Sequence, residues 1–195
     1  MDEEKSTPEL RVGEKIRERR EQKGLSLQDM ANRTGYTSAL LSQVENHFIS
    51  PPLGALIKIA KALEVKVGTF FGDEPRESYA IVRKDERKHI SRYASKEGVS
   101  YGYSYESLGF DKKDRQMEPF LVTLEPATVK SEKLSAHDGE EFIFILEGEM
   151  EAILGDHKDV LYPGDSIYYD SAIPHKVQCH REIPTKILAV IWTPQ

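Results

Sequence analysis

The chain has 195 residues, of which 38% are hydrophobic and 31% charged, a composition typical of a folded protein and unlike that of a disordered one. No apolar run approaches the roughly 18–20 residues that cross a bilayer, and the N-terminus is too acidic for a signal peptide. A single cysteine cannot form a disulfide framework. We therefore expect a cytoplasmic protein with no membrane partner. The net charge is −6, yet residues 1–70 hold 11 Lys/Arg against 10 Asp/Glu, so the acidic excess lies in the rest of the chain.

The first third of the chain has the pattern of a helical domain. Periodicity and capping residues predict five helices, the last one short, at residues 13–23, 27–34, 38–46, 52–63 and 67–71. Gly24 would end the first helix, Ser26 and Thr37 are good N-caps for the second and third, and Pro52 suits the first turn of the fourth. We expect this domain to cover residues 9–72, followed by a linker at 73–78.

After the linker the hydrophobic period changes to that of strands. Short β-rich segments, most of them separated by Gly, Pro or Asp, are predicted at residues 79–83, 99–108, 119–124, 141–146, 149–154, 166–169 and 186–192. So many short strands in about 115 residues are typical of a sandwich or a barrel. The fold class expected is therefore α plus all-β in two domains, with the β-domain at residues 79–195.

The second and third predicted helices have the residue types of a DNA-reading module. Ala31 is small where two helices would cross, and Gly35 permits a tight turn between them. Leu41 and Val44 would hold the third helix against the second, which leaves small and amide side chains on its outer side. Such side chains let a helix lie deep in a major groove. The alternative is a helical unit that only dimerises the protein.

These segments, GLSLQDMANRTGYTSALLSQVEN and then PPLGALIKIAKAL, resemble the lambda-repressor-like (XRE-type) helix-turn-helix family. The resemblance covers residues 11–71 and implies a five-helix DNA-binding domain. The family often has Gln at the start of the second helix, where this chain has Leu27, so Gln28 is expected to contact phosphate instead. His47 stands where the family often has Gly. The DNA contacts expected are Gln28, Thr37, Ser38, Ala39, Ser42, Gln43 and Asn46.

Three residues of the β-domain have the side chains and spacing of a metal site. His137 and Glu141 lie four residues apart, and His175 follows the turn sequence Pro163-Gly164-Asp165. Two imidazoles and one carboxylate form a facial triad with open coordination positions, which suits Fe(II) and also Mn, Co, Ni or Zn. Cys179 is either an additional soft ligand or, more simply, a small buried residue.

This pattern resembles the cupin superfamily over residues 100–193. Glu141 and Gly148 keep the spacing of the family's first motif, and the Pro-Gly-Asp turn with His175 matches the second. The resemblance implies a small β-barrel, or jelly roll. His137 falls on the second His of the first motif, whereas Ser135 replaces the first His. Because Ser135 replaces a family ligand, the barrel is expected to bind a metal, to bind an organic ligand or to bind neither.

Tyr101, Tyr103 and Tyr105 alternate along one predicted strand and therefore share one of its faces. If that face points inward, the phenols line a pocket, because a buried phenol can still find a hydrogen-bond partner. If it points outward, they form an interface stripe. We favour the inward orientation, with a ligand pocket that includes Tyr103, Tyr105 and Ser135.

The order of the two domains resembles a large family of bacterial transcription regulators. This implies a homodimer that binds a two-fold operator in double-stranded DNA and whose cupin domain binds a small-molecule effector or a divalent metal. The architecture also resembles the iron-dependent hydroxypropylphosphonate epoxidases, whose metal ligands match the triad. However, Leu134 aligns with a pocket asparagine of these enzymes and Glu97 lies near an aligned pocket arginine, so a phosphonate dianion would lack its partners. A regulator is the favoured hypothesis, and an iron oxygenase with a vestigial DNA-binding domain is the alternative.

Overall fold

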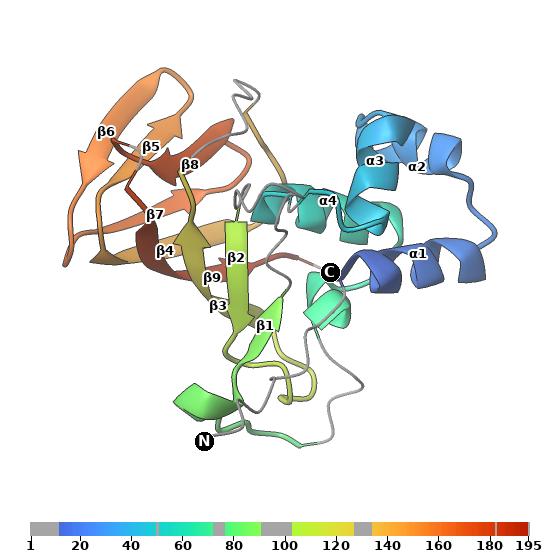
Figure 1. Ribbon diagram of the computed structural model, residues 1–195, viewed down its shortest axis with the longest axis horizontal. Helices are drawn as coiled ribbons and strands as arrows, with labels where there is room; N and C mark the ends of the chain where they lie inside the picture. Colours follow the sequence, from blue (N-terminus) through green and yellow to red (C-terminus); the bar gives the residue numbers. More distant parts are fainter. Residues whose placement is uncertain are drawn as a thin grey trace, which may run out of the picture.

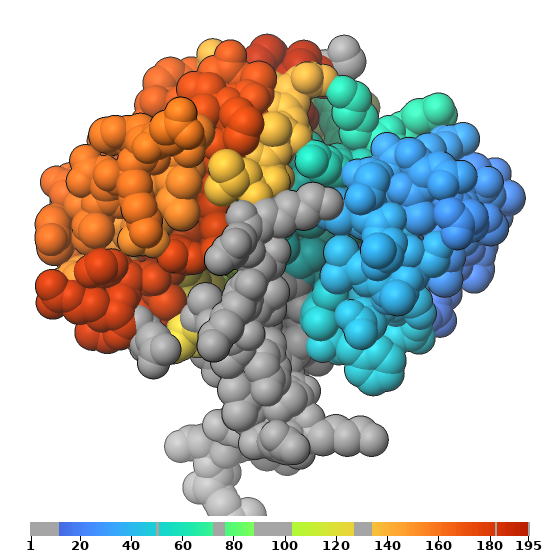
Figure 2. Space-filling model, turned by 90° about the horizontal axis from the view of Figure 1, so that it is seen from above, coloured from blue at the N-terminus to red at the C-terminus, as the bar shows by residue number. Residues whose placement is uncertain are grey.

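The computed structural model of the protein describes residues 12–49, 51–71, 77–90, 103–126, 134–181 and 183–194. Helices form the N-terminal part and strands the C-terminal part, and the two lie side by side (Figures 1 and 2). Most of the predicted linker, Tyr101 and Glu97 lie outside the described residues. None of the helices within these ranges is long and apolar enough to cross a membrane.

The helical part contains four α-helices and one 3₁₀-helix: α1 Val12–Gln22, α2 Leu27–Thr34, α3 Ser38–Glu45, α4 Leu53–Ala62 and η1 Val67–Phe71. Local signals fix these bounds, since Gly24 and Gly35 adopt left-handed conformations with φ of 66° and 73°. Ser26 caps α2 and forms a complete capping box with Asp29. The fifth predicted helix is thus a 3₁₀-helix, because five residues are too few to sustain an α-helix.

The β-part has two antiparallel sheets (Figure 1). One has six strands in the order β1-β2-β3-β9-β4-β7, and the other has three in the order β6-β5-β8. Their bounds are β1 Lys88–Ile90, β2 Tyr103–Ser107, β3 Met117–Leu124, β4 Glu140–Glu147, β5 Met150–Leu154, β6 His157–Leu161, β7 Ser166–Asp170, β8 His175–Cys179 and β9 Thr185–Trp192. A short 3₁₀-helix, η2 Lys84–Glu86, precedes β1.

The predicted strands agree with this arrangement except at four places. Residues 79–83 form no strand, whereas β6, β8 and the three-residue β1 have no counterpart among the predicted segments. The polar sequence of β6, His157–Leu161, explains the first omission, because its side chains are largely exposed. In β8, His175–Cys179, a single aliphatic residue, Val177, gives too weak a pattern.

The two parts of the chain contact one another at Pro51, which precedes α4, and between η1 and the six-stranded sheet. The Tyr105 hydroxyl donates a hydrogen bond of 2.8 Å to the Pro51 carbonyl, and Tyr105 is 1% exposed. The rings of Phe71 and Phe120 meet edge to face at 4.8 Å. At Gly68, a Cβ atom would lie 2.0 Å from the guanidinium of Arg115. The helical part is therefore docked on the barrel.

Candidate metal centre and DNA-binding surface

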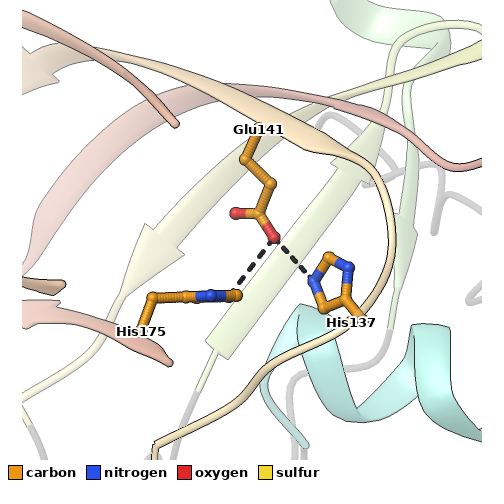
Figure 3. A group of neighbouring side chains, drawn as sticks. All are labelled: His137, Glu141 and His175. Atoms are coloured by element: carbon orange, nitrogen blue, oxygen red, sulfur yellow. Dashed lines mark hydrogen bonds and ion pairs between the residues drawn. The ribbon is translucent and has the colours of Figure 1, made fainter. Parts of the chain in front are cut away.

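The three predicted ligands meet inside the barrel (Figure 3). His137 precedes β4, Glu141 lies in β4 and His175 begins β8, and all three are buried. One nitrogen or oxygen of each lies within 4.8 Å of the others, and no other cluster of this kind occurs among the described residues. Cys179 is outside the cluster and donates a hydrogen bond to the Glu125 carbonyl. The three side chains therefore lie close enough together for one ion to contact all of them.

Hydrogen bonds fix which nitrogen of each imidazole faces the centre. Nδ1 of His137 lies 3.2 Å from the Asp138 carbonyl, and Nδ1 of His175 lies 2.8 Å from the Ile173 carbonyl. Only a protonated Nδ1 can donate to a carbonyl, so in a neutral ring Nε2 is the acceptor. Both Nε2 atoms face one carboxylate oxygen of Glu141, at 2.9 and 3.6 Å. These three hydrogen-bond acceptors face one point and would repel one another, so either a cation must lie between them or one of the rings must be protonated.

The Glu141 carboxylate is held in its charged form. Burial alone would raise its pKa, but the adjacent imidazoles of His137 and His175 and the hydrogen bond from Tyr169 outweigh this and lower the pKa to about 2. The Tyr169 hydroxyl lies 2.6 Å from the second carboxylate oxygen, and burial together with the nearby charge raises the pKa of Tyr169 well above its usual value. Tyr169 is therefore a permanent donor that orients the carboxylate, as partners of metal ligands do.

Sequence reasoning missed Tyr169 and also missed a contribution from α4. Tyr169 pairs directly with Glu141 in the register of β7 on β4, which the sequence does not reveal. In α4, a Cβ atom at Gly54 would lie 2.3 Å from Ser135 Oγ and 3.4 Å from His137 Cδ2. A helix of the N-terminal part thus forms a wall of the candidate metal centre, and it is the helix beside His137 in Figure 3.

The proposed pocket residues point inward, as the alternation of the strand predicted. Tyr103 and Tyr105 stack with ring centroids 6.1 Å apart, and the Tyr103 hydroxyl donates to the Val177 carbonyl. Burial raises the pKa of Tyr103 to about 12, so it remains a neutral donor. The buried Ser135 Oγ has no hydrogen-bond partner, although the Ser135 backbone pairs with His175 on both sides. These residues line the interior close to the triad.

A cleft of about 1060 Å³ separates α4 from the barrel. His137 belongs to its lining, together with segments of both parts of the chain. Its described cationic side chains are Arg33, Lys58, Lys61, Lys66 and Arg115. They outnumber the three carboxylates in the same lining, Glu64, Glu118 and Asp138. The cleft is therefore net positive in a chain whose net charge is −6.

The outer side of α3 carries the predicted DNA-reading residues. Ala39, Gln43 and Asn46 are exposed, as are Gln28 in α2 and the N-cap Thr37, whereas Ser38 and Ser42 are half-buried. Hydrogen bonds join the set, from Ser38 to Gln28 and from Asn46 to Ser42. His47 has a φ of 60°, so this position does adopt the left-handed conformation expected for a glycine.

Glu45, the one acidic residue of α3, points away from this surface. Its side chain is 4% exposed and accepts hydrogen bonds of 2.7 and 2.9 Å from the guanidinium of Arg20. Arg17 adds a longer contact of 3.5 Å and also donates to Asn46. The outer side of α3 is consequently free of negative charge.

The comparisons with known proteins identify both parts of the chain. Residues 16–70 match the helix-turn-helix family and residues 120–191 match the cupin domain family. The chain is a helix-turn-helix protein with a cupin domain. A crystal structure of an HTH_3 family transcriptional regulator from Vibrio cholerae shares the fold of this helix-turn-helix cupin protein, with a TM-score of 0.62, 24% identity and coverage of 95% of this chain and 97% of the other.

Relatives of known function include both a regulator and an enzyme. The HTH-type transcriptional regulator PuuR of Escherichia coli K12 is 27% identical over 168 residues, which cover 85% of this helix-turn-helix cupin protein and 86% of PuuR. The (S)-2-hydroxypropylphosphonic acid epoxidase of Streptomyces wedmorensis is 29% identical over 171 residues, which cover 83% of this chain and 85% of the epoxidase. The overall sequence similarity is nearly the same for the regulator and the enzyme, so it does not distinguish the two functions. The residues of the candidate sites must distinguish them.

Proposed function

We propose that this protein is a sequence-specific, DNA-binding transcription regulator that acts as a homodimer in the cytoplasm, and whose cupin domain binds a divalent metal and a small-molecule effector. The observation that carries the proposal is the outer side of α3. Its exposed amides, Gln43 and Asn46, suit base and phosphate contacts, and the burial of Glu45 against Arg20 keeps a carboxylate away from DNA. A helix that had abandoned DNA would have no need of this arrangement.

The chemistry of the donor set supports a metal in the cupin domain. His137 Nε2, His175 Nε2 and Glu141 Oε1 are three acceptors that face one point, while Nδ1 of each ring is held by a carbonyl and the second carboxylate oxygen by Tyr169. Such a triad suits Fe(II), Zn, Mn or Ni, and a bound ion would supply an electrophilic centre with open positions for an acidic ligand. The ion would also tie the segment before β4 to the start of β8.

The position of α4 supports a route from the cupin domain to the DNA-binding helices. Gly54 of α4 touches Ser135 and His137, and α4 also packs on α2. A ligand that moves Ser135 or His137 therefore acts on a helix of the DNA-binding part. This is a direct physical connection between two sites, which allosteric control of operator binding requires.

The charge of the cleft beside α4 supports an anionic effector, because its lining has five cationic side chains and three carboxylates. Lys61 is paired with Asp138 and Arg115 with Glu118, so the excess positive charge comes from the other cations of the lining, among them Lys58 of α4. A carboxylate or phosphate in this cleft would contact both parts of the chain, so its binding would depend on how they are oriented. Because three acidic side chains offset part of the positive charge of the lining, we expect an effector with only one or two negative charges.

An iron-dependent oxygenase is the second candidate, since the triad has open positions and an epoxidase is among the relatives. Leu134 argues against the same substrate, because a leucine offers a phosphonate no hydrogen bond where those enzymes are expected to have an asparagine. The regulator remains the proposal because the oxygenase has no use for an acid-free recognition surface.

Selection of bound sequences from a random double-stranded DNA pool tests the proposed function. The purified protein should enrich a palindromic motif with half-sites about one helical turn apart, and affinity should fall steeply with salt. Gln43→Ala should relax one base position by about 1–3 kcal/mol, whereas Gln22→Ala, on the exposed end of α1, should leave preference unchanged. Absence of enrichment at low salt would reject the regulator and make Fe(II)-dependent turnover the next assay.

Elemental analysis tests the metal. His137→Ala, Glu141→Ala and His175→Ala should each remove the bound ion, while His157→Ala should retain it, because His157 is exposed on β6 away from the triad. Equal metal content in all four variants would eliminate the proposed site without affecting the DNA-binding proposal.

A further inference from the structure

The outer face of the six-stranded sheet is apolar. Of the eleven large hydrophobic side chains that are exposed among the described residues, four lie on this face according to the strand registers. Tyr168, Met117 and Trp192 are 65, 59 and 40% exposed, and Phe142 joins them. This clustering matters because single exposed hydrophobic residues are ordinary, whereas a contiguous group marks an interaction surface.

Strand register places these side chains side by side. Phe142 of β4 pairs with Val190 of β9 on one side and with Tyr168 of β7 on the other. In the next row on the same face, Phe144 pairs with Leu188. Residues that are directly paired share a face, so the rows form one continuous apolar surface across the central strands. We call this surface, formed by the outward residues of β3, β9, β4 and β7, the outer sheet face.

The opposite face of the same strands cannot serve as this surface, because it forms the interior of the barrel. Ile143, Ile145, Ile187 and Ala189 alternate with the outward residues and are at most 3% exposed. The strands are therefore apolar on both faces. A sheet with one face in water normally alternates apolar and polar residues, so continuous apolar strands indicate that both faces are covered.

We propose that the outer sheet face is the dimer interface, and that its partner is a second copy of this chain. The inference rests on the homodimer of the proposed function and adds where that dimer forms. Four strands of up to eight residues make a face of about 26 by 19 Å, or roughly 500 Å². Two copies packed face to face bury about 1000 Å², which is near the lower limit for a specific interface.

The charges at one end of the face favour a second copy over an unrelated protein. Glu147 of β4 and Lys186 of β9 are paired in register, with 3.6 Å between their charged groups. Consider a two-fold axis that lies in the interface, runs parallel to β4 and β9, and passes midway between them. Rotation about this axis places β4 of each copy opposite β9 of the other copy. Glu147 then faces Lys186 twice and Phe142 faces Val190 twice. The face is self-complementary in charge and in shape, as a two-fold interface must be.

Sedimentation equilibrium without DNA tests the interface. The wild-type protein should be a dimer at micromolar concentration. Val190→Asp puts a charge at the centre of the face and should raise the dimer dissociation constant about 30-fold or more, because a buried unpaired charge is poorly tolerated. Val160→Asp is the matched control: Val160 is a half-buried valine that pairs with Glu151 in the other sheet, and the variant should remain dimeric.

A charge exchange keeps the test independent of folding defects. Lys186→Glu should weaken the dimer, and Lys186→Glu combined with Glu147→Lys should restore it. A monomeric wild-type protein, or a Val190→Asp variant as dimeric as its control with unchanged circular dichroism, would overturn the proposal. Since no DNA is present, a protein that fails to bind any operator can still give the predicted result, and the two failures remain distinguishable.

Discussion

Replacement of Gly54 by alanine probes the contact between α4 and the candidate metal centre. The added Cβ would lie 2.3 Å from Ser135 Oγ and 3.0 Å from Ser135 Cβ, so one of the two segments must move. Overpacking of this kind costs about 1–3 kcal/mol. Alanine is more favourable than glycine inside a helix by about 1 kcal/mol. The free energy of unfolding of Gly54→Ala should therefore fall by about 0–2 kcal/mol.

The contact itself is isolated by a double-mutant cycle with Ser135→Gly, which removes both clashing atoms. In that background Gly54→Ala should stabilise the protein by up to about 1 kcal/mol, because only the gain in helix propensity remains. The coupling between the two substitutions is then about 1–3 kcal/mol. Urea unfolding followed by circular dichroism measures all four proteins. Effects that add to within about 0.5 kcal/mol would mean that Gly54 and Ser135 do not touch.

The remaining predictions concern the ion pair behind α3 and the metal centre. Glu45→Ala leaves the Arg20 guanidinium partly buried without its carboxylate and should lower the free energy of unfolding by about 3 kcal/mol, whereas Glu21→Ala, an exposed neighbour, should change it little in the same urea titration. Tyr169→Phe should weaken metal binding by about 10–100-fold, as measured by calorimetry, because the Glu141 carboxylate loses the donor that orients it. Tyr168→Phe, on the outer face, should leave the affinity unchanged. Equal affinities of the two variants would show that Tyr169 does not orient Glu141. Chelation of a metal present at about 100 times its dissociation constant should remove about 2.7 kcal/mol of stability, and an unchanged melting temperature would contradict metal occupancy.

Much of the helical part could be predicted from the sequence, because its signals are local. Ser26 and Thr37 cap the helices that follow them, and Gly24 and Gly35 adopt the left-handed conformations that end the helices before them. Asp29 stands where a capping box usually has the longer Glu or Gln, and its shorter side chain does reach the Ser26 backbone, at 2.8 Å. Local chemistry thus determined four of the five predicted helices to within about two residues.

The sheets were predicted less completely, because strand pairing depends on residues far apart in the chain. The alternation in β3, β4 and β9 was visible, whereas β6 lacks apolar residues at its exposed end and β8 has one aliphatic residue among polar ones. Register is also invisible in a single sequence, and a one-residue shift would turn Glu141 from the interior to the outer face. The register shift between Ile145 and Glu147 in the pairing of β4 with β9 could not be predicted for the same reason.

The clustering of His137, Glu141 and His175 could be predicted because their residue types and spacing are distinctive, but their surroundings could not. Tyr169 contributes through its register opposite Glu141, and Gly54 contributes through the docking of α4. Both are tertiary facts with no local pattern. Alternation placed Tyr103 and Tyr105 on one face, and the capacity of buried phenols for hydrogen bonds favoured the inward direction, whereas the bond from Tyr105 to Pro51 required the packing of the two parts.

The docking of α4 on the barrel limits how far the two parts can be recombined. A chimaera that joins these helices to the barrel of a relative would set Gly54 against a foreign residue at position 135 and Phe71 against a foreign partner for Phe120. Truncation after Phe71 would leave that ring in water and open one side of the barrel. The border between the helix-turn-helix part and the cupin domain therefore runs through a shared surface, so a substitution on one side of it constrains which residues the other side can accept.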